Sequence, residues 1–233
     1  RTLNDDFNSL PGLTRAMMRY LINRSGPLAM SVNQAGGFFR GHADEPVPNI
    51  QLYFNPLSYR IPAPPDTTLT ADAYSGFLLA FNSCRPDSRG TIDLASADAN
   101  EPAVIRPNYL GTRRDQDEAI QGSRLIRALA ETAALGAVID AEVTPADAVH
   151  DDQSMLEYFR ANAGSIYHLC GTCAMGPDPR EAVVDGSLRV HGVSGLRVID
   201  ASIFPNITSG NLNAPVMMVA EKGADLILQD HPI

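Results

Sequence analysis

Two spacings of apolar residues run along this chain, and each predicts a different kind of element. Near the N-terminus, apolar side chains recur three or four positions apart, at Met17, Met18, Leu21 and Ile22. This spacing predicts a helix over residues 1–24, with Pro11-Gly12 as a breaker and Gly26-Pro27 at its end.

Further along, the period changes to two. Ile50, Leu52 and Phe54 alternate with their neighbours, which predicts a half-buried strand. Residues 77–81 and 91–95 continue this pattern, so we expect a sheet in the first half of the chain.

The segments between these strands and residue 165 are predicted to be loops and helices. Prolines make residues 60–70 a loop, and residues 85–90 have the composition of a hairpin connection. A helix is expected over residues 114–135, and a shorter one after the capping residues Asp151 and Asp152. Strands followed by helices indicate an α+β fold with an antiparallel sheet flanked by helices.

The last 65 residues differ from the rest of the chain in their predicted secondary structure. Residues 188–193 and 196–200 are short β-rich pieces joined by Gly and Ser, and a long helix is predicted from Pro215 to about Leu228. Proline suits a first helical turn, because its missing N–H has no intrahelical partner there. Asn213 is favoured as the N-cap of this helix, a position for which asparagine is strongly preferred.

The composition of the chain argues against several classes of binding partner and cellular location. A net charge of −9 argues against nucleic acid or an anionic membrane as partner, since both require a basic face. No apolar run approaches the roughly 20 residues that span a bilayer, and no signal peptide is apparent. Three cysteines are too few for a disulfide framework, so we expect a reducing, cytoplasmic location, free or peripheral to a membrane. Because the chain begins with Arg1, we expect a fragment of a longer protein.

The chemistry is concentrated near the C-terminus. His168 stands before a Gly-rich turn, and imidazole can act as a base at neutral pH. Asn211 follows 43 residues later, at the expected mouth of the last helix, where an amide can donate a hydrogen bond to an alkoxide. A helix N-terminus there could also stabilise an anionic flavin. The other histidines are expected to be solvated (His42, His150 and His231) or structural (His191).

The motif Cys170-Gly171-Thr172-Cys173 is of a kind that can form a redox pair or half of a zinc site. No second C-x-x-C or H-x-x-x-H completes a zinc site, and no thioredoxin-like pattern surrounds it. We favour the reading in which its small residues let the backbone pass close to a planar ligand, and we expect no metal.

Three motifs resemble the C-terminal part of glucose-methanol-choline (GMC) oxidoreductases, flavin enzymes that oxidise alcohols. They are H-x-x-G-T-x-x-M-G at 168–176, V-V-D-x-x-L-R-V-H-G-V-x-G-L-R-V-I-D-A-S at 183–202, and T-S-G-N-x-N-A-P at 208–215. Residues 89–98 and 107–110 also resemble the substrate domain of that family.

The resemblance implies a role for each site residue. It implies that His168 is the catalytic base and that Asn211 occupies the second catalytic position. It places Asp200 and Ala201 near the ribityl-pyrophosphate of FAD, and Asn213 and Pro215 beside the flavin ring. It further implies a helical lead-in at 1–24, a substrate-binding domain at 25–167 and, at 168–233, a strand-helix segment that completes the FAD-binding domain.

The sequence departs from the family pattern at two points. It contains no G-x-G-x-x-G, the glycine cradle that holds a dinucleotide pyrophosphate. We therefore expect FAD to bind this chain alone weakly or not at all, and an N-terminal FAD-binding half to be its partner. Gln34 replaces the acidic residue of the choline-handling members, which disfavours a quaternary-ammonium substrate.

We therefore hypothesise that the chain is the C-terminal part of an FAD-dependent alcohol dehydrogenase or oxidase whose substrate is a small-molecule alcohol. Two alternatives remain open. One is a hydroxynitrile lyase of the same family, although those enzymes tend to carry histidine where Asn211 stands. The other is an inactive fragment or interaction module, which resemblance of fold alone does not exclude.

Overall fold

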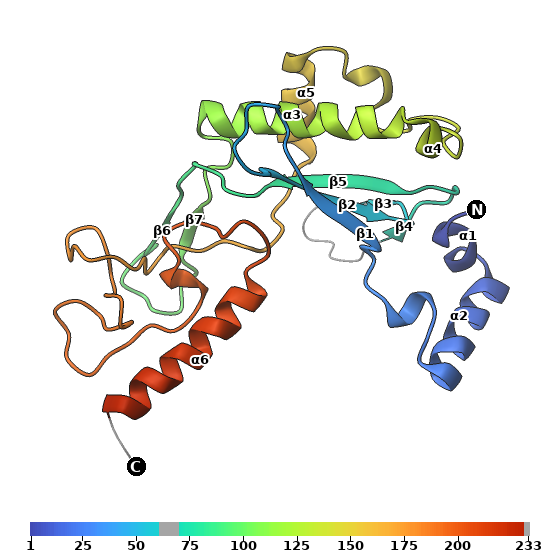
Figure 1. The fold of residues 1–233 in the computed structure, drawn as a ribbon. Helices are drawn as coiled ribbons and strands as arrows, with labels where there is room; N and C mark the ends of the chain where they lie inside the picture. The colour runs from blue at the N-terminus through green and yellow to red at the C-terminus, as the bar shows by residue number, and fades with distance from the viewer. Residues whose placement is uncertain (61–69, 231–233) are drawn as a thin grey trace. The chain divides into compact units, whose positions relative to one another are not determined.

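The structure is a computed structural model that describes residues 1–60 and 70–230. The chain divides into two compact units (Figure 1). Unit 1 contains residues 1–82 and 122–139, and unit 2 contains residues 83–121 and 140–233. Small antiparallel sheets and separate helices confirm the expected α+β class.

Unit 1 is built from short helices and five strands. Its helical elements are α1 (Leu3–Phe7), α2 (Leu10–Asn23), the 3-10 turn η1 (Pro27–Ala29) and α4 (Ala133–Gly136). Its strands are β1 (Ala35–Phe39), β2 (Ile50–Asn55), β3 (Tyr59–Arg60), β4 (Thr70–Ala71) and β5 (Leu78–Ser83).

The main sheet has the order β1-β2-β5, with β1 antiparallel to β2. Ile50 and Leu52 are buried while Gln51 and Tyr53 are half-buried, so the alternation is confirmed over residues 50–53. At the end of the strand it is wrong, because Asn55 is buried and Phe54 is only half-buried. Gly36 lies against the Leu52 carbonyl, where an added Cβ would be 2.3 Å from the oxygen. The glycine therefore lets β1 approach β2 closely.

The N-terminal helix differs from the single helix expected over residues 1–24. It is divided into α1 and α2, and the break lies at Asn8 and Ser9 rather than at Pro11-Gly12. The Ser9 side chain accepts a hydrogen bond from the Gly12 N–H and caps α2. Pro11 fits in the first turn of α2, because a backbone N–H there has no intrahelical acceptor. The N–H that proline lacks therefore costs the helix no hydrogen bond.

A buried asparagine fastens α1 to the strands. Asn4 is fully buried, and its Nδ2 donates to the carbonyls of Ser58 (2.8 Å) and Asp72 (3.0 Å). The proline loop expected at 60–70 lies outside the described residues except at its ends. Those ends, Arg60 and Thr70, pair across β3 and β4.

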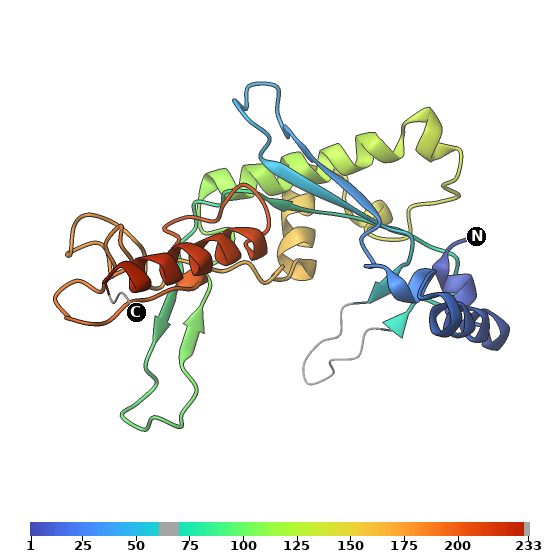
Figure 2. The ribbon, with the colours of Figure 1, turned by 60° about the horizontal axis from the view of Figure 1, so that its bottom comes forward.

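Unit 2 contains a two-stranded sheet and most of the longer helices. Its elements are β6 (Thr91–Asp93), β7 (Val104–Arg106), the turns η2 (Ala146–Ala148) and η3 (Ala201–Ile203), and the helices α5 (Asp152–Asn162) and α6 (Asn213–Asp230). Helix α3 (Arg113–Ala130) crosses the boundary between the units. Figure 2 shows β6 and β7 as a ribbon that stands clear of α6.

The hairpin expected at residues 85–90 is wrong. Strand β5 belongs to the sheet of β1 and β2, whereas β6 pairs with β7, so residues 85–90 connect two different sheets. Pairing of β6 depends on a partner that follows later in the chain, and local composition does not reveal it.

The helix expected over 114–135 is also divided, into α3 and α4. Thr132 adopts an extended backbone, and its hydroxyl donates to the Leu129 carbonyl, which ends α3. The expected cap of α5 is confirmed, since the Asp151 side chain accepts from the Ser154 N–H. Helices α3 and α5, with the residue that follows η2, share a core of five buried side chains: Ala119, Ile120, Val149, Met155 and Leu156.

Candidate active site

The motif at 168–176 lies directly beside η3. The Gly171 and Cys173 N–H groups both donate to the Ser202 carbonyl, at 3.1 and 3.0 Å, and the Met175 N–H donates to the Ile203 carbonyl at 2.8 Å. The backbone that follows His168 is therefore held against the backbone that follows Asp200.

Gly171 makes this pairing possible. Its φ is +98°, a conformation that residues with a side chain rarely adopt. A Cβ at this position would also lie 3.3 Å from the Phe204 carbonyl oxygen. The glycine of the H-x-x-G-T motif thus serves both a positive φ and a close approach to the Phe204 backbone, while the expected close approach to a planar ligand stays a prediction.

His168 is half-buried at the start of the motif. Tyr167 precedes it with a φ of +63° and a side chain that is 91% exposed, and Leu169 follows it, also exposed. A tyrosine in the left-handed region is strained, and such strain is common beside functional groups. The predicted base therefore lies between two uncovered apolar side chains.

Asp200 orders the turn that receives the motif. Its Oδ1 accepts hydrogen bonds from the Ser202 N–H (2.8 Å) and hydroxyl (2.5 Å), and these bonds lower the pKa of the Asp200 carboxyl. The carboxylate remains at the surface, while Ala201 beside it is half-buried. A fixed negative charge at this turn can accept hydrogen bonds from the hydroxyls of a ligand.

Asn211 lies on the loop between η3 and α6 and is exposed. Leu212, which follows it, is buried and anchors the end of the loop. Two arginines hold the middle of this loop: Arg85 donates to Ser209 Oγ and Arg89 donates to Asn206 Oδ1.

The N-cap interpretation of Asn213 is wrong by one position. Helix α6 begins at Asn213, and the first helical hydrogen bond runs from the Val216 N–H to the Leu212 carbonyl, so Leu212 is the N-cap. Asn213 is exposed and its Nδ2 lies 3.9 Å from Met217 Sδ. Pro215 lies in the first turn, as expected.

A single apolar cluster joins α6 to η3. Ile203 and Val219 are buried together with Val184 and Leu188. Gly223 of α6 also packs tightly on Ile199, where an added Cβ would lie 2.7 Å from Ile199 Cγ2. The start of α6 and the turn at Asp200 therefore belong to one packed body (Figure 1). The expected β-rich pieces at 188–200 are present as isolated bridges, Val184 to Val190 and Arg189 to Arg197.

Sequence reasoning missed the residues that support this loop. Asp115 is buried and accepts hydrogen bonds from the N–H groups of Asp87 and Ser88, each at 2.8 Å. Burial opposes ionisation of this carboxyl, but the hydrogen bonds from Ser88 and Asp87 outweigh it and lower the pKa of Asp115. The ionised group fixes the turn that carries Arg85 and Arg89. The sequence signal that could have indicated this support is the pair Arg85 and Arg89 on either side of the turn at 86–88.

The cysteines of the C-x-x-C motif are free thiols. Burial raises the pKa of the Cys170 thiol, and the positive charge of Arg89 opposes this shift in part. A raised pKa disfavours the reactive thiolate. Within residues 1–60 and 70–230, no three His, Cys, Asp or Glu side chains gather as a metal site would require.

Gln34 lies in unit 1, just before β1. Its N–H donates to the Phe54 carbonyl, which extends the ladder, and its side-chain amide folds back onto the Ser31 carbonyl. No negative charge stands at this position to attract a cationic substrate.

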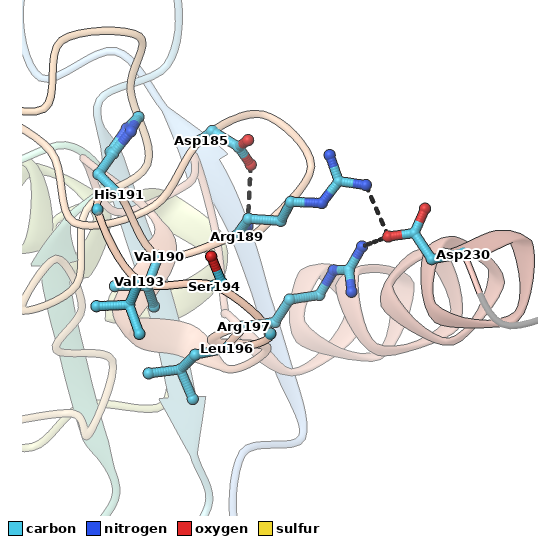
Figure 3. A pocket seen from close by; sticks show the side chains of 11 residues that line it. Asp185, Arg189, Val190, His191, Val193, Ser194, Leu196, Arg197 and Asp230 are labelled. Atoms are coloured by element: carbon cyan, nitrogen blue, oxygen red, sulfur yellow. Dashed lines mark hydrogen bonds and ion pairs between the residues drawn. The ribbon is translucent and has the colours of Figure 1, made fainter.

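A separate hollow lies in unit 2 (Figure 3). It is lined by residues 189–197 together with Asp185 and Asp230, and it contains none of the predicted site residues. Asp230 accepts from both Arg189 and Arg197 at 2.6 Å, which lowers the pKa of its carboxyl to about 2. The arginines are thus engaged in holding the end of α6.

Comparison with known proteins gives a consistent result. A family model described as GMC oxidoreductase matches residues 86–220. The chain is 34% identical to an alcohol dehydrogenase (acceptor) of Pseudomonas putida, covering 96% of this chain and 39% of that protein. It is 38% identical to an oxygen-dependent choline dehydrogenase of Pseudomonas fluorescens strain Pf0-1, covering 92% of this chain and 37% of that protein.

A solved structure, pyridoxine 4-oxidase from Mesorbium loti, is also similar, with a TM-score of 0.74 at 27% identity. The match covers 87% of this chain and 39% of that one. The chain spans less than two fifths of the length of each of these relatives. Among the described residues, no helix is long and apolar enough to cross a membrane.

Proposed function

The chain belongs to the GMC oxidoreductase family, and from this premise we propose that it forms the substrate-side part of an FAD-dependent enzyme that oxidises an alcohol. The observation that carries the proposal is the pairing of the His168 motif with the turn at Asp200, together with the cluster that joins this turn to α6. Residues for proton transfer and for cofactor contact thereby come from one packed body.

The residues of this chain fit the edge of a flavin site. Asp200 and Ala201 would contact the ribityl-pyrophosphate region, and Asn213 and Pro215 would border the ring. Helix α6 has 18 residues, so its N-terminus carries a partial positive charge that suits a reduced, anionic ring. Met217 and Met218 on its first turns are exposed, as expected where a planar group or a second segment covers them. The glycine cradle for the pyrophosphate is absent from the sequence, so it would come from another part of the protein.

In this proposal, His168 takes the proton of the substrate hydroxyl, and the Asn211 carboxamide donates a hydrogen bond to the oxygen that becomes negative. The bound flavin supplies the hydride acceptor. The strained Tyr167 and the exposed Leu169 border the reacting carbon and exclude water from it. General-base catalysis of this kind contributes roughly 10²- to 10⁴-fold in rate.

The domain boundaries that we propose are a helical lead-in at 1–24, a substrate-binding domain at 25–167 and an FAD-binding segment at 168–233. Three free thiols are typical of a reducing compartment, so we assign the protein to the cytoplasm. The amide at Gln34 favours an uncharged alcohol over a quaternary ammonium compound.

Anaerobic reduction of the flavin tests this function. In the holoenzyme formed with the flavin-binding portion, a primary alcohol should bleach the oxidised flavin absorbance, while the isolated chain should do nothing. A holoenzyme that releases cyanide from a cyanohydrin without bleaching would instead be a hydroxynitrile lyase. A chain that forms no such complex, or a complex inert toward both substrates, would contradict an enzymatic role.

A further inference from the structure

Helix α2 presents an apolar face to solvent. It packs on α1 and η1 through small residues, Gly12 and Ala16, which are both buried. Its larger apolar side chains are all exposed, from 37% for Leu13 to 82% for Leu10, and they are Leu10, Leu13, Met17, Met18, Leu21 and Ile22. Figure 1 shows the position of α2 after α1, near the N-terminus of the chain.

Exposed apolar side chains also occur in the segment that follows the helix. Leu28, Met30 and Val32 follow α2, and each is more than 40% exposed. Exposed apolar patches of this extent mark contact sites for a protein or a membrane. The exposed side chains here are leucine, isoleucine, valine and methionine, whereas protein interfaces are enriched in aromatic anchors.

The charge around this face differs from that of the whole chain. Residues 7–43 contain four arginines, Arg15, Arg19, Arg24 and Arg40, and no acidic residue, although the chain carries −9. Arg15, Arg19 and Arg24 are exposed. Arg15 and Arg19 lie three positions before Met18 and Ile22, so each neighbours an apolar side chain on the helix surface. The nearest acidic residues, on α1, are engaged: Asp6 pairs with Arg1 at 2.5 Å, and Asp5 accepts from Ser75 at 2.6 Å.

We propose that α2 and the segment that follows it bind the surface of a membrane rich in anionic lipid. An amphipathic helix with arginines at its edge lies in the plane of the headgroups, with its apolar face among the acyl chains. The net charge of the chain does not prevent this, because charges beyond about 8 Å are largely screened at physiological salt. The helix has 14 residues, so it lies on the membrane rather than across it.

The test uses vesicles of phosphatidylcholine with and without phosphatidylglycerol. The 233-residue chain should sediment with the anionic vesicles at 0.15 M salt and be released at 1 M salt. Each arginine near an anionic surface strengthens binding about fivefold, so Arg15→Gln with Arg19→Gln should weaken it roughly 25-fold. Leu21→Ser with Ile22→Ser should weaken it at least about tenfold. Arg180→Gln and Leu94→Ser, both exposed in unit 2, are the matched controls.

Because the chain has no tryptophan, a single introduced tryptophan reports only its own surroundings. Its fluorescence therefore distinguishes insertion among the acyl chains from adsorption at the membrane surface. The emission of Met18→Trp should shift to the blue on adding anionic vesicles, while that of Leu94→Trp should not. Binding that leaves Met18→Trp unshifted, or that is equal on neutral vesicles, would overturn the proposal.

Other occupants of this face give different results. A dimer in analytical ultracentrifugation that Leu21→Ser with Ile22→Ser dissociates would assign the face to a second copy and overturn the proposal. Loss of vesicle binding when the flavin-binding portion is added would assign it to an internal interface, with the same consequence. The vesicle assay needs no catalysis, so its outcome is independent of the proposed alcohol oxidation.

Discussion

Arg89 donates a hydrogen bond to the Oδ1 of Asn206, although 117 residues separate the two along the chain. The same turn supplies Arg85, which donates to Ser209, and both acceptors lie on the loop that ends at Asn211. The buried carboxylate of Asp115 fixes the turn itself. The position of the proposed alkoxide-binding amide thus depends on a carboxylate that never touches the substrate.

Replacing Arg89 should therefore impair the proposed reaction without removing a catalytic group. In the holoenzyme, Arg89→Met should lower kcat about tenfold, because small displacements of a positioned group are costly in rate. Arg180→Met is the control, since Arg180 bonds only locally to Asp178. Steady-state kinetics measure both, and an Arg89→Met enzyme with the kcat of the parent would remove this turn from the mechanism.

Loss of the proposed base should be more severe. His168→Ala in the holoenzyme should reduce kcat by about 10²- to 10⁴-fold, because no other group would take the hydroxyl proton. The absorbance of the bound flavin should stay nearly unchanged. His150→Ala is the matched control, because His150 is exposed and its ring hydrogen bond is to the Asp147 carbonyl, three residues away. Equal turnover in the two variants would refute the role of His168.

Gly171 and Gly186 form a pair that separates backbone strain from loss of glycine. Gly171→Ala must adopt φ near +98° and lies close to the Phe204 carbonyl, so it should destabilise the chain by about 1–3 kcal/mol. Gly186 has no atom within 4 Å of an added Cβ, so Gly186→Ala should change the free energy of unfolding by less than about 0.5 kcal/mol. Urea denaturation compares them, and equal midpoints would show that the 171–202 pairing carries no strain.

The tight packing of Gly223 on Ile199 gives a coupled prediction. Gly223→Ala should destabilise by about 1–3 kcal/mol, because the new methyl group would lie 2.7 Å from Ile199 Cγ2. Ile199→Val removes Cδ1, which would lie 2.8 Å from the new methyl group, and should reduce part of that penalty. A double-mutant cycle measures the coupling, and strictly additive effects would mean that the two residues do not constrain each other.

The elements that local chemistry determines could be predicted from sequence, and the others could not. Alternation at Ile50 and Leu52 follows from a period-two strand, and the Asp151 cap acts within four residues of itself. The break at Thr132 depends on a side chain that competes for a backbone carbonyl, and propensity alone does not reveal it. Strand β6 pairs with β7 across the loop at 94–103, and turn composition at 85–90 does not reveal that partner. The bonds from Arg85 and Arg89 join segments more than 100 residues apart, so no local pattern contains them.

The ion pairs at the end of α6 predict an acid-sensitive stability. Hydrogen bonds from Arg189 and Arg197 lower the pKa of Asp230 from 3.8 to about 2, so the folded chain binds this proton less readily than the unfolded chain does (Figure 3). The stabilisation is complete above pH 4 and is lost as the pH falls toward 2. Asp230→Asn should remove this component, so its free energy of unfolding should fall less steeply between pH 4 and 2 than that of the parent chain. Parallel curves for the parent and Asp230→Asn would show that the two arginines do not stabilise α6 through this carboxylate.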